Sequence, residues 1–253
     1  MVTRLGPDQA DAGKSPDEVV TEEPLEIRLD DVTVATTMRT PGNDFELAAG
    51  FVRGEGLVTG RIRDIRYCGT GSAVESEFNV VSVDSGGAAP EPTPRLGLIS
   101  SSCGICGSDA IHDLATRLEP VATVSPLPEA LAAVARNVAA GQELFERTGG
   151  LHAAADFDPM TGDVGVVRED IGRHNAVDKV VGRLMLDDAV PATGRALWVS
   201  GRASFEMVQK AWSAGFGGLV SVSAASSLAV ETAERAGIAV YGFSRDGSAV
   251  RYS

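Results

Sequence analysis

The sequence predicts a mixed α+β / α/β fold, in which a small unit of strands around one helix precedes a larger domain of alternating helices and strands. Near the start of the folded region, apolar and polar residues alternate as in a half-buried strand. From residue 128 onward, helical apolar stripes and short apolar runs follow one another in turn. This repeated alternation favours a partly parallel sheet covered by helices. A hydrophobic content of 43% agrees with a folded chain.

Residues 1–24 are expected to form a disordered acidic tail. The stretch has six acidic residues against Arg4 and Lys14, and it contains three prolines. With so few large apolar residues, it cannot bury enough surface to offset the entropy lost on ordering. An arm that binds a partner is the alternative interpretation.

Residues 25–84 are expected to form a small α+β domain with the element order β-β-α-β-β. Its helix is predicted after Asn43, because Asn43 and Glu46 have the spacing of a capping box. Gly54 and Gly56 are expected to end that helix. The strands are predicted at residues 25–29, 32–34, 62–67 and 78–83.

Residues 85–127 are expected to be a linker that carries a C-x-x-C loop and one helix, which Ser108 or Asp109 can cap. Residues 128–253 form the larger predicted domain. Its helices are expected around residues 131–138, 177–184, 205–212 and 228–236, and its strands at 151–157, 164–167, 196–199, 219–222 and 239–243.

The overall charge excludes some classes of partner. The chain has 22 Lys and Arg against 35 Asp and Glu, which gives a formal net charge of -13. A broad basic surface for nucleic acid or anionic lipid is therefore not expected. The sequence shows neither a membrane-spanning apolar run nor a hydrophobic signal core. Three cysteines cannot form a disulfide scaffold in a chain of this size, so a reducing cytoplasm is expected.

Cys103 and Cys106 are the predicted catalytic residues. They lie in a segment of serines and glycines, where the backbone can bend and expose them. The start of the helix expected after them would favour thiolate over thiol. A thiolate can attack a disulfide or persulfide sulfur, and a neighbouring thiol can resolve the product. The alternative is a pair of small residues packed in a turn, which is the interpretation favoured for Cys68.

Two other uses of a C-x-x-C pair fit the sequence less well. Zinc would need two further ligands, and His112, His152 and His174 do not have ligand spacing. A thioredoxin-like site follows an early strand of a βαβ unit, whereas here the α/β region comes afterwards. No intrinsic metal is predicted.

Glycines and basic residues follow several predicted strands. Arg173 and His174 begin a predicted helix, and Gly201 and Arg202 stand at the corresponding place after the next strand. Helix starts attract anions, and ligands of open α/β sheets bind at the carboxyl edge. The segments 148–152 and 242–247 have a similar composition, so a local anion pocket is expected. The alternative for residues 168–175 is a solvated loop, with Asp170 or Asn175 capping the helix.

The order of elements from about residue 128 resembles the cytidine deaminase fold. That family's zinc signature would fall at the starts of two helices. At the first, His174-Asn175-Ala176 replaces His-Ala-Glu, and the second lacks the Pro-Cys-x-x-Cys ligands. The resemblance therefore implies a deaminase-like domain without the zinc signature.

The chain also resembles the FdhD family of formate dehydrogenase accessory sulfurtransferases, over roughly residues 25–250. The resemblance is carried by the segments 102–107, 148–152, 169–179 and 200–206. It implies a protein that takes persulfide sulfur from a cysteine desulfurase of the IscS type. The sulfur would pass to the molybdenum bis(molybdopterin guanine dinucleotide) cofactor before the cofactor enters the catalytic subunit of formate dehydrogenase. A homodimer is also implied.

The same resemblance assigns roles to individual residues. Cys103 would hold the persulfide and Cys106 would assist. The family's C-terminal F-x-R-x-G-R cofactor-binding segment falls on Phe243, Ser244, Arg245, Asp246, Gly247 and Ser248, where Ser248 replaces the usual final basic residue. Two alternative functions are a thiol-disulfide oxidoreductase and a non-catalytic chaperone that only binds the molybdenum cofactor.

Overall fold

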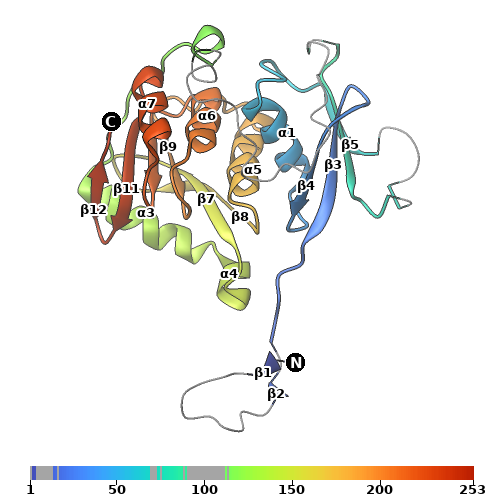
Figure 1. The fold of residues 1–253 in the computed structure, drawn as a ribbon, viewed down its shortest axis with the longest axis horizontal. Coiled ribbons are helices and arrows are strands. Elements are labelled where there is room, and N and C mark those ends of the chain that lie inside the picture. The colour runs from blue at the N-terminus through green and yellow to red at the C-terminus, as the bar shows by residue number, and fades with distance from the viewer. Residues whose placement is uncertain are drawn as a thin grey trace.

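The computed structural model describes residues 17–68, 73–74, 76–87, 89, 112 and 114–253. It also describes the backbone of two paired short strands, β1 (Val2–Thr3) and β2 (Lys14–Ser15). Cys103, Cys106 and most of the expected linker lie outside the described residues. The remaining elements form two sheets with helices between and around them (Figure 1).

The smaller sheet contains the elements expected for the first unit, in the expected order. They are β3 (Glu23–Leu29), β4 (Val32–Arg39), α1 (Asp44–Gly54), β5 (Asp64–Tyr67) and β6 (Val80–Asp84). The spatial order is β4-β3-β6-β5, and only the pair β3·β6 is parallel. Strand β3 starts earlier than expected, because Glu23 and Pro24 already pair with β4. These two residues therefore belong to the sheet and not to the tail.

The predicted capping box at the start of α1 is wrong. Asn43 precedes the helix with a φ of 56°, in the left-handed region, and its side chain makes no cap hydrogen bond. A side-chain cap requires an extended backbone at this position. Glu46 does not return to the helix start; it accepts two hydrogen bonds from the Arg168 guanidinium, at 2.5 and 2.8 Å. The spacing thus predicted the helix, but Glu46 binds a distant part of the chain.

The larger sheet alternates with helices, as expected for residues 128–253. Its spatial order is β12-β11-β10-β9-β7-β8, with β9, β10 and β11 parallel to one another and the other neighbours antiparallel. The elements are α3 (Pro128–Ala140), α4 (Glu143–Thr148), β7 (His152–Phe157), β8 (Val164–Asp170), α5 (Arg173–Leu186), β9 (Ala196–Val199), α6 (Phe205–Ala214), β10 (Gly218–Ser221), α7 (Ser227–Ala236), β11 (Ala239–Arg245) and β12 (Ser248–Arg251).

Two of these elements were not expected. Helix α4 has six residues and buries none of them, so it lacks an apolar stripe. Strand β12 is mostly exposed and follows the turn at Asp246–Gly247, inside the segment predicted to bind a cofactor. Both elements depend on neighbours distant in sequence, which a periodic pattern does not report.

Helices cover both faces of the larger sheet. One core packs α5, α6 and α7 against one face, and a second core packs α3 against the other. Helix α1 lies between α5 and the smaller sheet, which has a core of its own (Figure 1). Among the described residues, no helix is both long and apolar enough to cross a membrane.

Helices α1 and α5 touch through their backbones. A β carbon on Gly50 would lie 1.8 Å from the carbonyl oxygen of Asp178, and one on Gly182 would lie 1.7 Å from that of Glu46. Only glycine permits such an approach. The predicted division into separate domains therefore remains an interpretation, because the two units share a close helix–helix contact.

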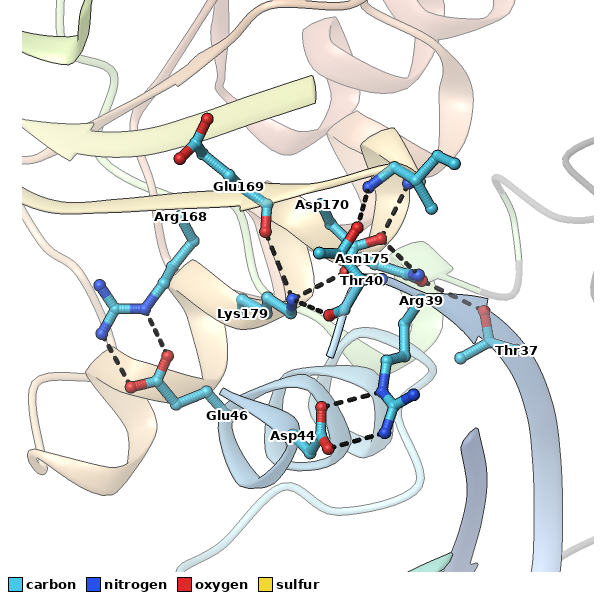
Figure 2. A network of polar contacts seen from close by, with 12 residues as sticks. Thr37, Arg39, Thr40, Asp44, Glu46, Arg168, Glu169, Asp170, Asn175 and Lys179 are labelled. Carbon is cyan, nitrogen blue, oxygen red and sulfur yellow. Dashed lines mark hydrogen bonds and ion pairs between the residues drawn. The ribbon is translucent and has the colours of Figure 1, made fainter. Parts of the chain in front are cut away.

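A buried polar network joins the same two units (Figure 2). Lys179 Nζ lies 2.7 Å from Asp170 Oδ2 and donates a hydrogen bond to the Thr40 carbonyl at 2.9 Å. The Lys179 and Asp170 side chains are only 2% and 0% exposed. Arg39 pairs with Asp44 in the same region, at 3.0 Å. Each ion pair lies within one unit, and a buried charge left unpaired costs about 3–5 kcal/mol. The two units are joined by the hydrogen bond from Lys179 to the Thr40 carbonyl and by one from the Thr40 amide to Asp170 Oδ2, at 3.2 Å.

Candidate functional site

The predicted sulfur site cannot be placed, because Cys103 and Cys106 lie outside the described residues. Residues 112 and 114–117 are helical, so the helix expected after the C-x-x-C loop is present in its described part. The chain beyond it is held at the ends of two helices: Trp212 Nε1 donates to the Glu119 carbonyl at 2.8 Å, and the Val121 amide donates to the Ala236 carbonyl at 2.8 Å. Cys68 is buried, with Sγ 2.8 Å from Ser76 Oγ.

The residues predicted to bind a cofactor lie along one edge of the larger sheet. The carboxyl ends of β9, β10 and β11 meet there because these strands are parallel. Ser221 Oγ donates to the Gly201 carbonyl at 2.7 Å, and the Phe243 amide donates to the Ser223 carbonyl at 3.0 Å. The edge thus carries Arg173 and His174 at the start of α5, Gly201 and Arg202 after β9, and residues 243–248 from β11 to β12. Their role in binding remains a prediction.

Arg173 and His174 have buried nitrogen atoms without a hydrogen-bond partner. Of the six such side-chain atoms in the described part of the chain, Arg173 Nε, His174 Nε2 and Ser244 Oγ belong to residues of this edge. A buried polar group left unsatisfied costs about 1–3 kcal/mol, so such groups call for a physical explanation. An anionic or hydrogen-bond-accepting ligand would satisfy the two nitrogen atoms.

Gly201 allows the loop after β9 to approach Arg173. A β carbon at Gly201 would lie 3.2 Å from Arg173 Cδ and 3.8 Å from His152 Nδ1. His152 Nδ1 lies 3.2 Å from Ser200 Oγ. Burial, together with the charges of Arg173 and His174, lowers the pKa of His152, so this imidazole is neutral at pH 7. The edge therefore combines an imidazole of lowered pKa with the adjacent guanidinium group of Arg173.

Glu206 is a residue of this edge that the sequence did not single out. Its Oε2 accepts a hydrogen bond from Ser204 Oγ at 2.9 Å and lies 3.6 Å from His174 Nε2. The interaction with His174, with Ser204 as a further contribution, lowers the pKa of Glu206 to about 2. Sequence patterns could not pair these residues, because Glu206 belongs to α6 and His174 to α5.

We expect acidification to remove the contribution of Glu206 to stability. The folded pKa of about 2 lies below the ordinary value of 4.5. Folding therefore favours the carboxylate: the contribution is complete above the ordinary value and is lost as pH falls through about 2. The measurement is the free energy of unfolding by denaturant, determined for the wild type and for Glu206→Gln at a series of pH values from neutral downward. The stability difference should narrow on acidification, and a constant difference would contradict the assignment.

The segment from Phe243 to Ser248 has an irregular backbone. Phe243 has a φ of 52°, and the register of β11 and β12 shifts between Gly242 and Arg245, as in a β-bulge. Such bulges redirect side chains at functional sites. Phe243 is 51% exposed, and Arg245 is exposed as well. The bulge thus presents an aromatic ring and a guanidinium group at the surface of the edge.

The first half of the segment 168–175 has a structural role, and its interpretation as a solvated loop is wrong. Asp170 is fully buried, and Arg168 pairs with Glu46. Glu169 accepts hydrogen bonds from the Leu144 and Phe145 amides, at 3.0 and 2.8 Å, at the start of α4. Neither Asp170 nor Asn175 caps α5, whose N-cap position is Gly172 with no side-chain cap bond.

Metal-ligating side chains do not converge in the described part of the chain. No group of three or more His, Cys, Asp or Glu residues there could hold a metal ion. His174 is the second residue of α5, where the deaminase comparison would place a zinc ligand, but the charged group beside it is Glu206.

Comparisons with known proteins show the family to which the chain belongs. A family model described as FdhD/NarQ matches residues 20–253. The chain is 46% identical over 244 residues to the sulfur carrier protein FdhD of Streptomyces coelicolor, covering 92% of this chain and 86% of the relative. It is 43% identical to that of Mycolicibacterium paratuberculosis, covering 98% and 93%. The crystal structure of a protein assigned as a formate dehydrogenase accessory protein of Desulfotalea psychrophila matches with a TM-score of 0.73 and 25% identity, covering 94% of this chain and 89% of that one. Because the family model spans both sheets and the whole candidate edge, the chain belongs to the FdhD/NarQ family.

Proposed function

We propose that this protein is a sulfur carrier for the maturation of formate dehydrogenase, and that it transfers sulfur to a molybdenum bis(molybdopterin guanine dinucleotide) cofactor. The relatives named sulfur carrier protein FdhD support the sulfur-carrying role. The formate dehydrogenase accessory protein of similar structure supports the target. A cysteine desulfurase would supply the sulfur, and the catalytic subunit of formate dehydrogenase would receive the cofactor.

The observation that carries the cofactor half of this proposal is the pair of unpartnered buried nitrogen atoms on Arg173 and His174. The guanine dinucleotide parts of the cofactor carry phosphates, whose oxygens accept hydrogen bonds from such donors. Arg202 and Arg245 are exposed on the same edge and add positive charge. The exposed Phe243 ring offers a flat surface on which a guanine base can stack.

The sulfur half of the proposal rests on Cys103 and Cys106. The Cys103 thiolate attacks the terminal sulfur of the desulfurase persulfide, and the desulfurase cysteine leaves as a thiolate. For delivery, the Cys106 thiolate attacks Cys103 Sγ and forms a disulfide, while the terminal sulfur leaves as hydrosulfide for the cofactor. A thiol reductant then restores both cysteines. This sequence balances electrons, because the two thiols supply the pair that reduces the transferred sulfur.

The proposed sulfur-carrying loop has to reach from the carboxyl ends of two helices to the cofactor-binding edge at the start of α6. The chain after the C-x-x-C segment is held at the carboxyl ends of α6 and α7, whereas Arg202 lies before the start of α6. Helix α6 has ten residues, a length of about 15 Å. His112 follows Cys106 by six positions, and an extended chain of this length spans about 20 Å. We propose delivery to the edge within one chain, with a homodimer as the other proposed arrangement.

We propose further that the larger domain is deaminase-like. In support, the expected order of elements is present, and two helices start beside the carboxyl edge, at Arg173 and Phe205. At these starts the chain places Arg173, His174, Gly201 and Arg202 in place of zinc ligands. The scaffold would thus bind phosphates where a deaminase binds its metal.

Mass spectrometry of the C-x-x-C peptide tests the function directly. The protein is incubated with a cysteine desulfurase and cysteine, and is then digested without reductant. We expect a gain of one sulfur atom on the peptide containing Cys103, removable by reductant. A loss of two hydrogens without any sulfur gain would instead indicate a thiol-disulfide oxidoreductase and contradict the proposal.

Removing a cationic group from the edge is expected to weaken guanine nucleotide binding. Arg202→Ala and Arg245→Ala should each raise the dissociation constant of GDP by about tenfold, because a charge-assisted contact to phosphate is worth about 1.5–3 kcal/mol. Isothermal titration calorimetry measures the constant, with the exposed Arg235 of α7, changed to Ala, as a matched control. Unchanged binding in both edge variants would remove them from the phosphate site.

A further inference from the structure

Two adjacent basic side chains at the start of α5 occupy a position where helix electrostatics favour acidic ones. The positive end of a helix dipole favours acidic residues, yet the first turn of α5 has none and begins with Arg173 and His174. Arg202 lies at the same edge and adds further positive charge. Such an arrangement needs negative charge nearby, and Glu206 on α6 supplies it at 3.6 Å from His174 Nε2.

We propose that Glu206 is a positioning residue, whose carboxylate holds the His174 imidazole at the sheet edge so that His174 and Arg173 together receive a phosphate group. This inference rests on the proposed function and deepens it. Glu206 does not itself contact the ligand; it acts through His174.

The surroundings of Glu206 fix its carboxylate. Ser204 Oγ donates a hydrogen bond to Oε2 at 2.9 Å, and Glu206 is the second residue of α6. At 3.6 Å the contact between Glu206 Oε2 and His174 Nε2 is longer than a hydrogen bond, and Nε2 has no hydrogen-bond partner among the described residues. The depressed pKa of Glu206 agrees with a fixed carboxylate at neutral pH.

The helices that carry the two residues are fixed by a second ion pair. Asp178 follows His174 by one turn on α5, and Lys210 follows Glu206 by one turn on α6. Their side chains are 2% and 4% exposed, and Lys210 Nζ lies 2.7 Å from Asp178 Oδ1. Glu55 at the end of α1 lies 3.7 Å from the same ammonium group. Since this buried pair holds the helices together, replacing Glu206 removes the restraint on His174 without releasing the helices.

The direction in which Glu206→Gln changes anion binding distinguishes a positioning role of Glu206 from a simple effect of its charge. Removing a carboxylate beside an anion site reduces repulsion, so Coulomb attraction alone predicts tighter anion binding in Glu206→Gln. Positioning predicts weaker binding, because the His174 ring is no longer held beside Arg173. The side chains of Glu and Gln have nearly the same shape, so the substitution changes mainly the charge.

The test measures GDP binding to the intact protein by isothermal titration calorimetry. We expect Glu206→Gln to raise the dissociation constant of GDP about fivefold, because neighbouring residues such as Glu206 and His174 affect binding together. Ser204→Ala should weaken it by a smaller factor in the same direction. The control is Glu231→Gln, which removes one exposed carboxylate of α7 and should leave the dissociation constant within about twofold.

A double-mutant cycle with His174→Ala supplies the decisive comparison. If Glu206 acts through His174, then Glu206→Gln causes no further weakening in the His174→Ala protein. A general structural effect would instead weaken binding equally in both backgrounds, and this result overturns the inference. Tighter or unchanged binding in the single variant overturns it as well, while the proposed function stands. Absence of GDP binding by the wild type contradicts the phosphate site itself, and with it the inference.

Discussion

A Cys103→Ala variant is expected to abolish the activation of formate dehydrogenase, with residual activity equal to that of cells lacking the protein. The variant removes the sulfur atom on which the persulfide would form, so no transfer can begin. The measurement is formate dehydrogenase activity in a strain whose own copy is deleted and replaced by the variant. The fold should be retained, because the substitution is small.

Two further variants sharpen this test. Cys106→Ala should have a milder effect, because an external thiol can take over release of the sulfur from Cys103. Cys68→Ser is the matched control: Cys68 contacts Ser76 inside the smaller unit, so its loss should leave activity close to that of the wild type. Normal activity in Cys103→Ala would exclude Cys103 from the mechanism. Formate dehydrogenase activity in a variant that lacks both Cys103 and Cys106 would favour the non-catalytic chaperone.

Gly182→Ala is expected to destabilise the protein by about 3 kcal/mol or more. A β carbon at this position would lie 1.7 Å from the Glu46 carbonyl oxygen and 2.8 Å from the Gly50 amide nitrogen. Both neighbours are backbone atoms of α1, so no side-chain rotation relieves the clash. Helices α1 and α5 must therefore separate, and this also strains the hydrogen bonds by which Lys179 and Asp170 hold Thr40.

Urea unfolding followed by circular dichroism measures the loss of stability caused by Gly182→Ala. Gly60→Ala is the control, because a β carbon at Gly60 meets no atom within 4 Å. Its stability should stay within about 0.5 kcal/mol of the wild type. If Gly182→Ala unfolds at the same urea concentration as this control, the close contact between the helices is wrong. We also expect weaker GDP binding in Gly182→Ala, because α5 carries Arg173 and His174.

Local patterns predicted most elements of the fold. The turn at Asp30–Asp31, the alternation around it and the apolar runs of the larger domain correspond to β3, β4, β9, β10 and β11. These elements are encoded by nearest neighbours in sequence, because strand and helix periods are local properties. Helix α4 was not predicted from the sequence. The amide of Leu144 at its start is capped by Glu169, which lies 25 positions later in the chain.

The roles of individual charged residues were harder to predict. The segment 168–175 looked uniform in sequence, yet Asp170 is buried beside Lys179 whereas His174 lies at the sheet edge. Glu46 had the spacing of a capping residue, and it binds Arg168 instead. A charged side chain pairs with whatever the fold brings near it, and sequence spacing does not contain that information.

The sequence by itself determined the order of helices and strands, the family resemblance and the presence of two thiols in a glycine-rich segment. Only the tertiary structure decided that Glu206 lies against His174 and that glycines bring α1 and α5 into backbone contact. The physical reason is range: periodicity and turns act over a few residues, whereas ion pairs, close packing and unsatisfied donors depend on segments that meet only in the folded chain.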